Sequence, residues 1–251
     1  LLHQGLDGID LLFRINIAIQ NGGFNLGVFR GGQIFKRQGQ ALNERASRDV
    51  RVLVVGNPCN TNAYIAMRNA PDLKRVCFSA MMRLDQNRAM ARVAEKLQAP
   101  VSGVEQVFVW GNHSNTMYPD IRFLRYKGHR LADQFDAQWQ EEFIKNVATR
   151  GGQIIKARGA SSAASAASAA LDHMRDWILG SQGKCCTMAV PSDGSYGIPE
   201  GLVFGFPCLC PGEGRYQIIS NMPITQEVRH RLDVTRDELL AEANAVADLL
   251  P

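Results

Sequence analysis

The stretch RVLVVGNPCNTNAYIAM, residues 51–67, carries the clearest structural signal in the chain. Its first six residues are a short apolar, β-branched run ending in Gly-Asn-Pro, which is typical of a buried parallel strand and a turn. TNAYIAMRNA (61–70) then predicts a helix. A strand, a polar turn and a helix in this order indicate an α/β sheet, in which ligands bind at the carboxyl ends of the strands.

Working outward, the hydrophobic pattern predicts helices at 33–48 and 83–98 and a second buried strand at 104–111. Residues 1–31 are rich in glycine and have no clear period. The alanine-rich segment 160–179 resembles a low-complexity linker, but it lacks Gly and Pro and becomes amphipathic toward its end. We therefore expect a helix there, with a small face that allows close packing.

The second half of the chain has the pattern of an α+β unit. Residues 134–157 predict a long helix interrupted near Gly151 and Gly152. CCTMAV (185–190), LVFGFPC (202–208) and RYQIIS (215–220) predict an antiparallel sheet. Thr235 and Glu238 form a Thr-x-x-Glu pattern, which predicts a capping box at the start of a last helix, 235–250.

The composition is that of an ordinary globular protein. The 251 residues include 28 Lys+Arg and 24 Asp+Glu, a net charge of +4, and 45% are hydrophobic. These values exclude a disordered tail, a collagen and a coiled coil, and the basic excess is too small to indicate a nucleic-acid partner. No apolar run reaches the roughly 18 to 20 residues of a membrane helix, so we expect no membrane partner. Acidic and basic residues interrupt any signal-peptide core near the N-terminus.

The six cysteines form no C-x-x-C pair, which argues against a zinc ribbon or a thioredoxin motif, and no metal site is predicted. Their apolar, strand-like surroundings favour reduced core thiols and hence a cytosolic or organellar-matrix compartment. The first residue is Leu1 rather than Met, which we interpret as a processed product or a fragment.

Three polar clusters follow or adjoin the predicted buried elements. The first, GNPCNTN (56–62), offers amide groups to a ligand, although a turn and a helix N-cap need the same residues. In the second, Asp85 and Arg88 are three residues apart and share a helix face. They form either a surface ion pair or a site in which Arg88 binds a carboxylate and Asp85 orients a base. In the third, His113 follows a strand in a small polar loop, where a structural and a catalytic role are equally compatible with the sequence.

Together these clusters describe one reaction. A His paired with a carboxylate acts as a general base, and a neighbouring Arg fixes a carboxylate substrate. Oxidation of a hydroxyl beside that carboxylate also requires a hydride-accepting cofactor. A hydrolase that uses Asp85 and His113 is disfavoured, because the chain has no G-x-S-x-G nucleophile elbow.

The motifs VVGNPCNTNAYIAM, MRLDQNRA, FVWGNHSNTMYPD, ARGASSAASAA and SDGSYGIPEGLVFGFP resemble the NAD-dependent malate dehydrogenases of the cytosolic and bacterial branch. The resemblance extends from about residue 32 to the C-terminus, and we expect GNHS with RLDxNRA to distinguish this branch from the lactate dehydrogenases. It implies reversible oxidation of (S)-malate to oxaloacetate by NAD, as in the tricarboxylic acid cycle, in a cytoplasmic homodimer.

The resemblance also implies roles for individual residues. His113 is the proton acceptor and Asp85 its carboxylate partner. The substrate-binding residues are Arg88, Asn57 and Ser162. The cofactor-binding residues are Gln38, Val55, Gly56 and Asn57.

The chain departs from the family pattern near its N-terminus. No G-x-G-x-x-G turn occurs anywhere, and the two arginines of the substrate-closing loop are not recognisable in residues 1–31. Gly31 stands where the family has a cofactor-contacting Asn. We therefore interpret 1–31 as divergent, mis-spliced or frame-shifted. These losses weaken the binding of the pyrophosphate and the distinction between malate and lactate.

We predict the remaining part of a Rossmann-type NAD-binding domain, residues 1–80, followed by an α+β lactate/malate dehydrogenase catalytic domain, residues 81–251. Without its first strands the parallel sheet has an open edge, which predicts aggregation or low stability. The leading function is malate dehydrogenase. The alternative is a non-catalytic dimerising or regulatory fragment that cannot bind NAD.

Overall fold

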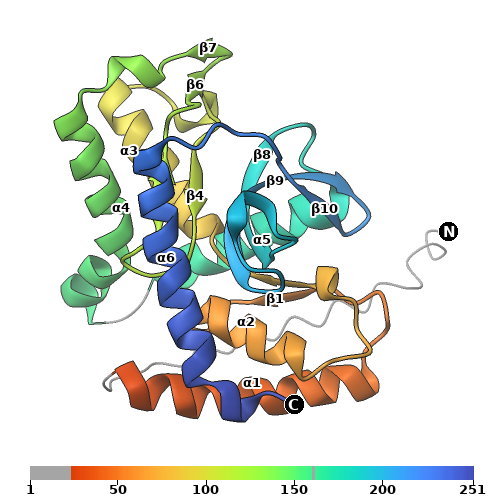
Figure 1. Cartoon of the computed structure of the whole chain (residues 1–251). Coiled ribbons are helices and arrows are strands. Elements are labelled where there is room, and N and C mark those ends of the chain that lie inside the picture. The colour runs from red at the N-terminus through yellow and green to blue at the C-terminus, as the bar shows by residue number, and fades with distance from the viewer. Residues whose placement is uncertain (1–23, 160–161) are drawn as a thin grey trace, which may run out of the picture.

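The computed structural model describes residues 24–159 and 162–251 and has a mixed α/β fold (Figure 1). The helices are α1 (Phe24–Arg45), α2 (Cys59–Arg68), α3 (Arg83–Leu97), α4 (Ala137–Arg158), α5 (Ala163–Leu179) and α6 (Gln226–Ala245). The strands are β1 (Val52–Val54), β2 (Phe78–Ala80), β3 (Val104–Glu105), β4 (Phe108–Trp110), β5 (Tyr118–Asp120), β6 (Arg125–Tyr126), β7 (His129–Arg130), β8 (Cys185–Pro191), β9 (Val203–Gly212) and β10 (Arg215–Ile218). The predicted α/β class is confirmed.

The main sheet has the order β1-β2-β8-β9-β10. β1 is parallel to β2 and the later strands are antiparallel, as predicted for 51–56 and for the second half, but β2 itself was not predicted. The two halves meet where Ala80 of β2 pairs with Ala189 of β8. Within the described residues β1 lies at the open edge of this sheet.

The helices pack against the sheet and against one another. α1 and α2 lie side by side at one end of the molecule, where the last turns of α6 reach them (Figure 1). The predicted helix at 160–179 is confirmed over Ala163–Leu179, while residues 160–161 lie outside the described part. Its buried Ala169 and Ala170 join a cluster with Met81 and Leu84, so small side chains do let α5 approach α3 closely.

The predicted single strand at 104–111 is wrong. Gln106 has a left-handed backbone with φ of 57°, which ends β3 before β4 begins. β3 then pairs with β6, whereas β4 pairs with β5. This break separates the short strand that leads to His113 from the preceding chain.

The predictions for three helices are also corrected. α1 begins nine residues before the expected start at residue 33 and ends at Arg45. α4 passes through Gly151 and Gly152 without interruption, since two glycines weaken a 22-residue helix without breaking it. α6 begins at Gln226 rather than at residue 235, and its N-cap is Thr225, whose hydroxyl accepts a hydrogen bond from the backbone N–H of Val228.

All six cysteines are free thiols; five are buried and Cys185 is partly buried, as expected of core thiols. In the described part of the chain, no helix is both long and apolar enough to span a membrane. Most of the divergent segment 1–31 lies outside the described residues, and the domain division near residue 80 remains a prediction.

Candidate functional site

The centre of the candidate site is Asp85, in the first turn of α3. Its side chain is only 1% exposed. Nδ1 of His113 donates to its Oδ2 at 2.5 Å, and Nη1 of Arg88 lies 3.6 Å from its Oδ1. A helix N-terminus favours a carboxylate, and the three-residue spacing places Arg88 on the same face. The buried carboxylate of Asp85 therefore contacts both His113 and Arg88, the two other residues predicted to carry charge in the site.

The charge of Asp85 controls the protonation of His113. Burial by itself lowers the pKa of His113, because it disfavours the charged ring. The Asp85 carboxylate opposes this through its charge and its hydrogen bond, and Arg88 adds a smaller lowering effect. The net result is a His113 pKa above its ordinary value, so the imidazolium persists to higher pH than in a free histidine.

Arg88 is hydrogen-bonded at the start of α5 and lies beside α4. Its Nη2 donates to the hydroxyl of Ser162, at the start of α5, at 3.1 Å. Its Nη1 faces α4, where a Cβ at Gly151 would lie 3.7 Å away. The side chain is 15% exposed, and no described carboxylate binds it with two hydrogen bonds. Its guanidinium therefore has N–H groups available for an anion.

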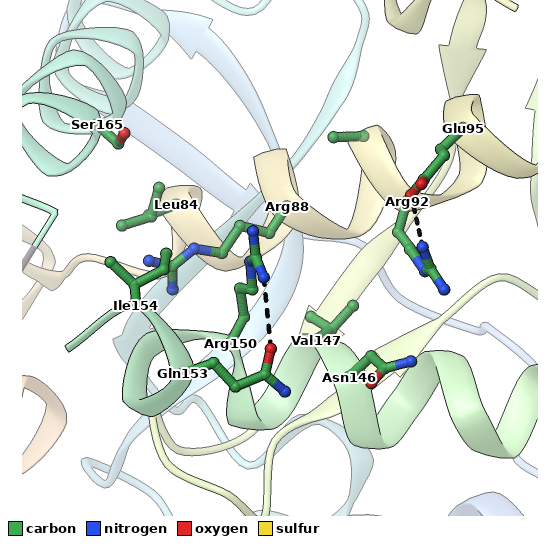
Figure 2. Close-up of a pocket in the computed structure, with 11 residues that line it drawn as sticks. Leu84, Arg88, Arg92, Glu95, Asn146, Val147, Arg150, Gln153, Ile154 and Ser165 are labelled. Carbon is green, nitrogen blue, oxygen red and sulfur yellow. Dashed lines mark hydrogen bonds and ion pairs between the residues drawn. The ribbon is translucent and has the colours of Figure 1, made fainter. Parts of the chain in front are cut away.

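A cleft of about 520 Å³ opens beside Arg88, between α3, α4 and the start of α5 (Figure 2). Arg92 and Arg150 also line it, and Arg150 donates to the side chain of Gln153 at 3.4 Å. Arg150 lowers the pKa of Arg88, after the larger effect of burial. Glu95 also lines the cleft and pairs with Arg92 at 2.6 Å, so Arg88 and Arg150 give the cleft its net positive charge. Asp85 and His113 lie outside its lining.

The polar cluster after β1 supplies the second group of candidates. Gly56 is buried, and its carbonyl accepts from the Asn62 side chain at 2.9 Å. Val55 packs on the cluster that contains Leu84, whereas the side chain of Asn57 is exposed. Val55, Gly56 and Asn57 therefore lie where β1 ends, the position predicted for a ligand.

One candidate is not tied to this centre. Ser162 binds Arg88, but Gln38 lies half-buried on α1, and within the described residues no hydrogen bond or ion pair links it to the others. The described part also contains no group of three or more His, Cys, Asp or Glu side chains placed to hold a metal.

Sequence reasoning missed the residues that hold the His113 loop, which we define as residues 111–116. Thr235 and Glu238 were predicted to cap a helix, and Glu242 was not singled out. All three hydrogen-bond the loop from the middle of α6. Their spacing of three and four residues places them on one helix face, the only signal the sequence offers for a shared role.

Comparison with known proteins identifies the family. A model of the lactate/malate dehydrogenase α/β C-terminal domain matches residues 82–250. The chain belongs to the lactate/malate dehydrogenase family. Its fold also matches a malate dehydrogenase from Naegleria fowleri, with 44% sequence identity, a TM-score of 0.89, and coverage of 94% of this chain and 73% of that chain.

Lactate dehydrogenases of the family match nearly as well. The Trichomonas vaginalis lactate dehydrogenase in complex with NADH and oxamate is 34% identical, with a TM-score of 0.88, over 94% of this chain and 74% of that chain. A Plasmodium falciparum malate dehydrogenase at 20% identity and a TM-score of 0.83, over 94% of this chain and 75% of that chain, adds support for the fold alone. Family membership is therefore established, whereas the similarity alone does not choose between malate and lactate.

Proposed function

We propose that this family member is an NAD-dependent dehydrogenase that interconverts (S)-malate and oxaloacetate. The observation that carries the proposal is the central position of Asp85, with His113 at 2.5 Å and Arg88 at 3.6 Å from its two oxygens. A base for the substrate hydroxyl and a cation for its carboxylate are the two groups this oxidation needs from the protein. Membership of a dehydrogenase family supports the same reaction.

The cofactor we propose is NAD. Val55 provides an apolar surface at the end of β1, Asn57 an exposed amide, and Gly56 a backbone without a side chain, which fits a nicotinamide ring and its carboxamide. Gln38 of α1 is the further proposed contact. When bound, NAD accepts the hydride that malate loses.

We assign the proton transfer to His113. Because Nδ1 donates to Asp85, Nε2 of the neutral ring carries the lone pair and accepts the hydroxyl proton. The Asp85 carboxylate stabilises the imidazolium that forms. In the reverse direction the same imidazolium returns the proton, which the raised His113 pKa favours.

Substrate binding rests on Arg88 and Ser162. The guanidinium fork matches a carboxylate with two parallel hydrogen bonds, and the Ser162 hydroxyl fixes its orientation through Nη2. Asn57 is the third proposed substrate contact. The net positive charge of the cleft, to which Arg150 contributes, raises the local concentration of anions near Arg88.

Malate is proposed over lactate because of the GNHS and RLDxNRA motifs and the higher identity to a malate enzyme. A homodimer in the cytoplasm and a role in the tricarboxylic acid cycle are part of the same proposal and follow from the sequence resemblance.

The test compares the wild-type chain with His113→Ala and oxaloacetate with pyruvate, following NADH consumption. We expect oxaloacetate to be the better substrate, and we expect His113→Ala to lower its turnover by on the order of 10²- to 10⁴-fold. An unchanged rate in the variant would remove the role of His113, and a preference for pyruvate would replace malate by lactate.

The alternative function is a non-catalytic dimerising or regulatory polypeptide that does not bind NAD. A fluorescence titration of the 251-residue chain with NADH separates the two functions. Saturable binding refutes the non-catalytic function, and absence of binding favours it.

A further inference from the structure

The His113 loop lies between two helices that are distant in the sequence. On one side, the side chain of Asn60 in α2 accepts from the backbone N–H of His113 at 3.1 Å and donates to the Gly111 carbonyl at 3.3 Å. On the other side lies α6, more than 110 residues further along the chain. The loop is therefore fixed by side chains of both neighbours rather than by its own turns alone.

Glu238 of α6 accepts several hydrogen bonds from side chains of the loop. One oxygen, Oε2, accepts from three donors: Asn112 Nδ2 at 2.9 Å, Ser114 Oγ at 2.5 Å and Thr116 Oγ1 at 2.6 Å. These donors lie on both sides of His113. A charged acceptor makes stronger hydrogen bonds than a neutral one, so this single carboxylate holds the loop both before and after His113.

Glu242, one turn further along α6, completes the contact. It is 4% exposed, and its Oε1 accepts from Asn112 Nδ2 at 2.9 Å. Its Oε2 accepts from the hydroxyl of Thr61 in α2. The carboxylate thus ties α6 to both the loop and α2, the two structures that contact each other at Asn60.

Thr235 sets how closely the loop approaches the helix. Its hydroxyl accepts from the backbone N–H of Asn112 at 2.8 Å, and a Cβ at Gly111 would lie 2.3 Å from its side chain. Gly111 also has a φ of 98°. The loop can lie against α6 only because residue 111 has no side chain.

We propose that Glu238 and Glu242 are positioning residues for His113, acting through the loop rather than on substrate. This rests on the proposed dehydrogenase function for its kinetic consequences, but not for its structural ones. The same loop carries the 2.5 Å contact between His113 and Asp85, so a shift of the loop away from α6 lengthens that contact. A purely structural role for the α6 carboxylates would affect unfolding and leave the state of His113 in the folded protein unchanged.

The test uses Glu238→Ala, Glu238→Gln and Glu242→Ala in the full chain, with Glu227→Ala as the matched control. Glu227 is on the same helix, is 75% exposed and pairs only with Arg231 among the described residues. The first readout is the pKa of His113 measured by NMR of its ring, which requires no turnover. The second is the split between kcat and KM for oxaloacetate reduction.

We expect Glu238→Ala and Glu242→Ala to lower the His113 pKa by about 1, because the stabilising contact with Asp85 loosens. We expect kcat to fall by about 10- to 100-fold with KM little changed, since the base is displaced rather than the substrate site. Glu238→Gln retains an oxygen acceptor and restores most of both values, and Glu227→Ala leaves them unchanged.

A lowered melting temperature with an unchanged His113 pKa in the folded variants would overturn the proposal. If Glu238→Ala does not fold, Ser114→Ala removes one hydrogen bond to Glu238 and the one that Ser114 accepts from the Thr116 backbone N–H, and it leaves the carboxylate its two other donors. It carries the same two expectations in weaker form. If the substitutions lower the His113 pKa as expected but the wild-type chain shows no turnover, the positioning role is supported and the dehydrogenase function of this chain is refuted separately.

Discussion

Replacing Asp85 by Asn isolates the charge that organises the candidate site. The substitution preserves side-chain volume and removes a negative charge 2.5 Å from His113 and 3.6 Å from Arg88. Burial then lowers the pKa of His113 without opposition. An opposite charge at such a distance changes a pKa by about 1 to 3, so we expect the His113 pKa to fall by that amount.

The catalytic consequence is a shortage of the proposed proton donor at neutral pH. The Asn amide also presents an N–H to Nδ1, which favours the wrong imidazole tautomer. We expect oxaloacetate reduction by Asp85→Asn to fall by on the order of 10²- to 10⁴-fold and its optimum to move to lower pH.

Stability follows the same ionisation. The folded-state pKa of His113 is above its unfolded value, so the pair with Asp85 stabilises the fold fully below the unfolded pKa. This contribution is lost as the pH rises through the folded pKa. We expect Asp85→Asn to lack this extra stability at acidic pH, which thermal melts at several pH values would show as a lower melting temperature.

The assay is an NMR titration of the His113 ring, together with the pH profile of turnover. Asp120→Asn is the control, because Asp120 is equally buried but pairs with Arg122 and Trp110 instead. We expect it to lower stability without changing the His113 pKa. An Asp85→Asn variant with the wild-type His113 pKa would refute the role of the charge.

Three further predictions concern backbone, substrate and sheet. Gly111→Ala lowers the free energy of unfolding in urea by about 2 to 5 kcal/mol, because the cost of a positive φ adds to overpacking on Thr235. The control Gly128→Ala, with a φ of 81° and open space, has only the backbone cost. Equal losses of stability in the two variants would contradict this. Arg88→Lys raises KM for oxaloacetate by about 10- to 100-fold through loss of the guanidinium fork, and an unchanged KM argues against carboxylate binding there. The open edge at β1 predicts concentration-dependent aggregation in light scattering, whereas a soluble monomer with a sharp melt opposes it.

The sequence predicted much of the fold where the signal is local. The helix at 83–98 and the antiparallel strands from 185 to 218 follow from periodicity and turn residues, and the structure confirms them closely. Asp85 and Arg88 are neighbours because of helical spacing. His113 lies near them for a reason the sequence did not predict, because β4 packs against α3 and β9 outside the parallel sheet.

What the sequence did not predict depends on contacts between distant segments. Glu238 and Thr235 fit a capping box by local pattern, but their partners lie on the His113 loop more than 115 residues away. The break at Gln106 comes from a left-handed backbone that no neighbouring residue type requires. Pairing partners outside the local window decide both features.

The most direct test of the proposed site is the rate at which the 251-residue chain oxidises NADH with oxaloacetate, compared with His113→Ala at equal folded concentration. We predict turnover by the wild-type chain and a loss of at least about 10²-fold in the variant. No turnover at saturating NADH would contradict the proposed activity of this chain, and equal measurable rates for the two proteins would contradict the assignment of His113, Asp85 and Arg88 as its site.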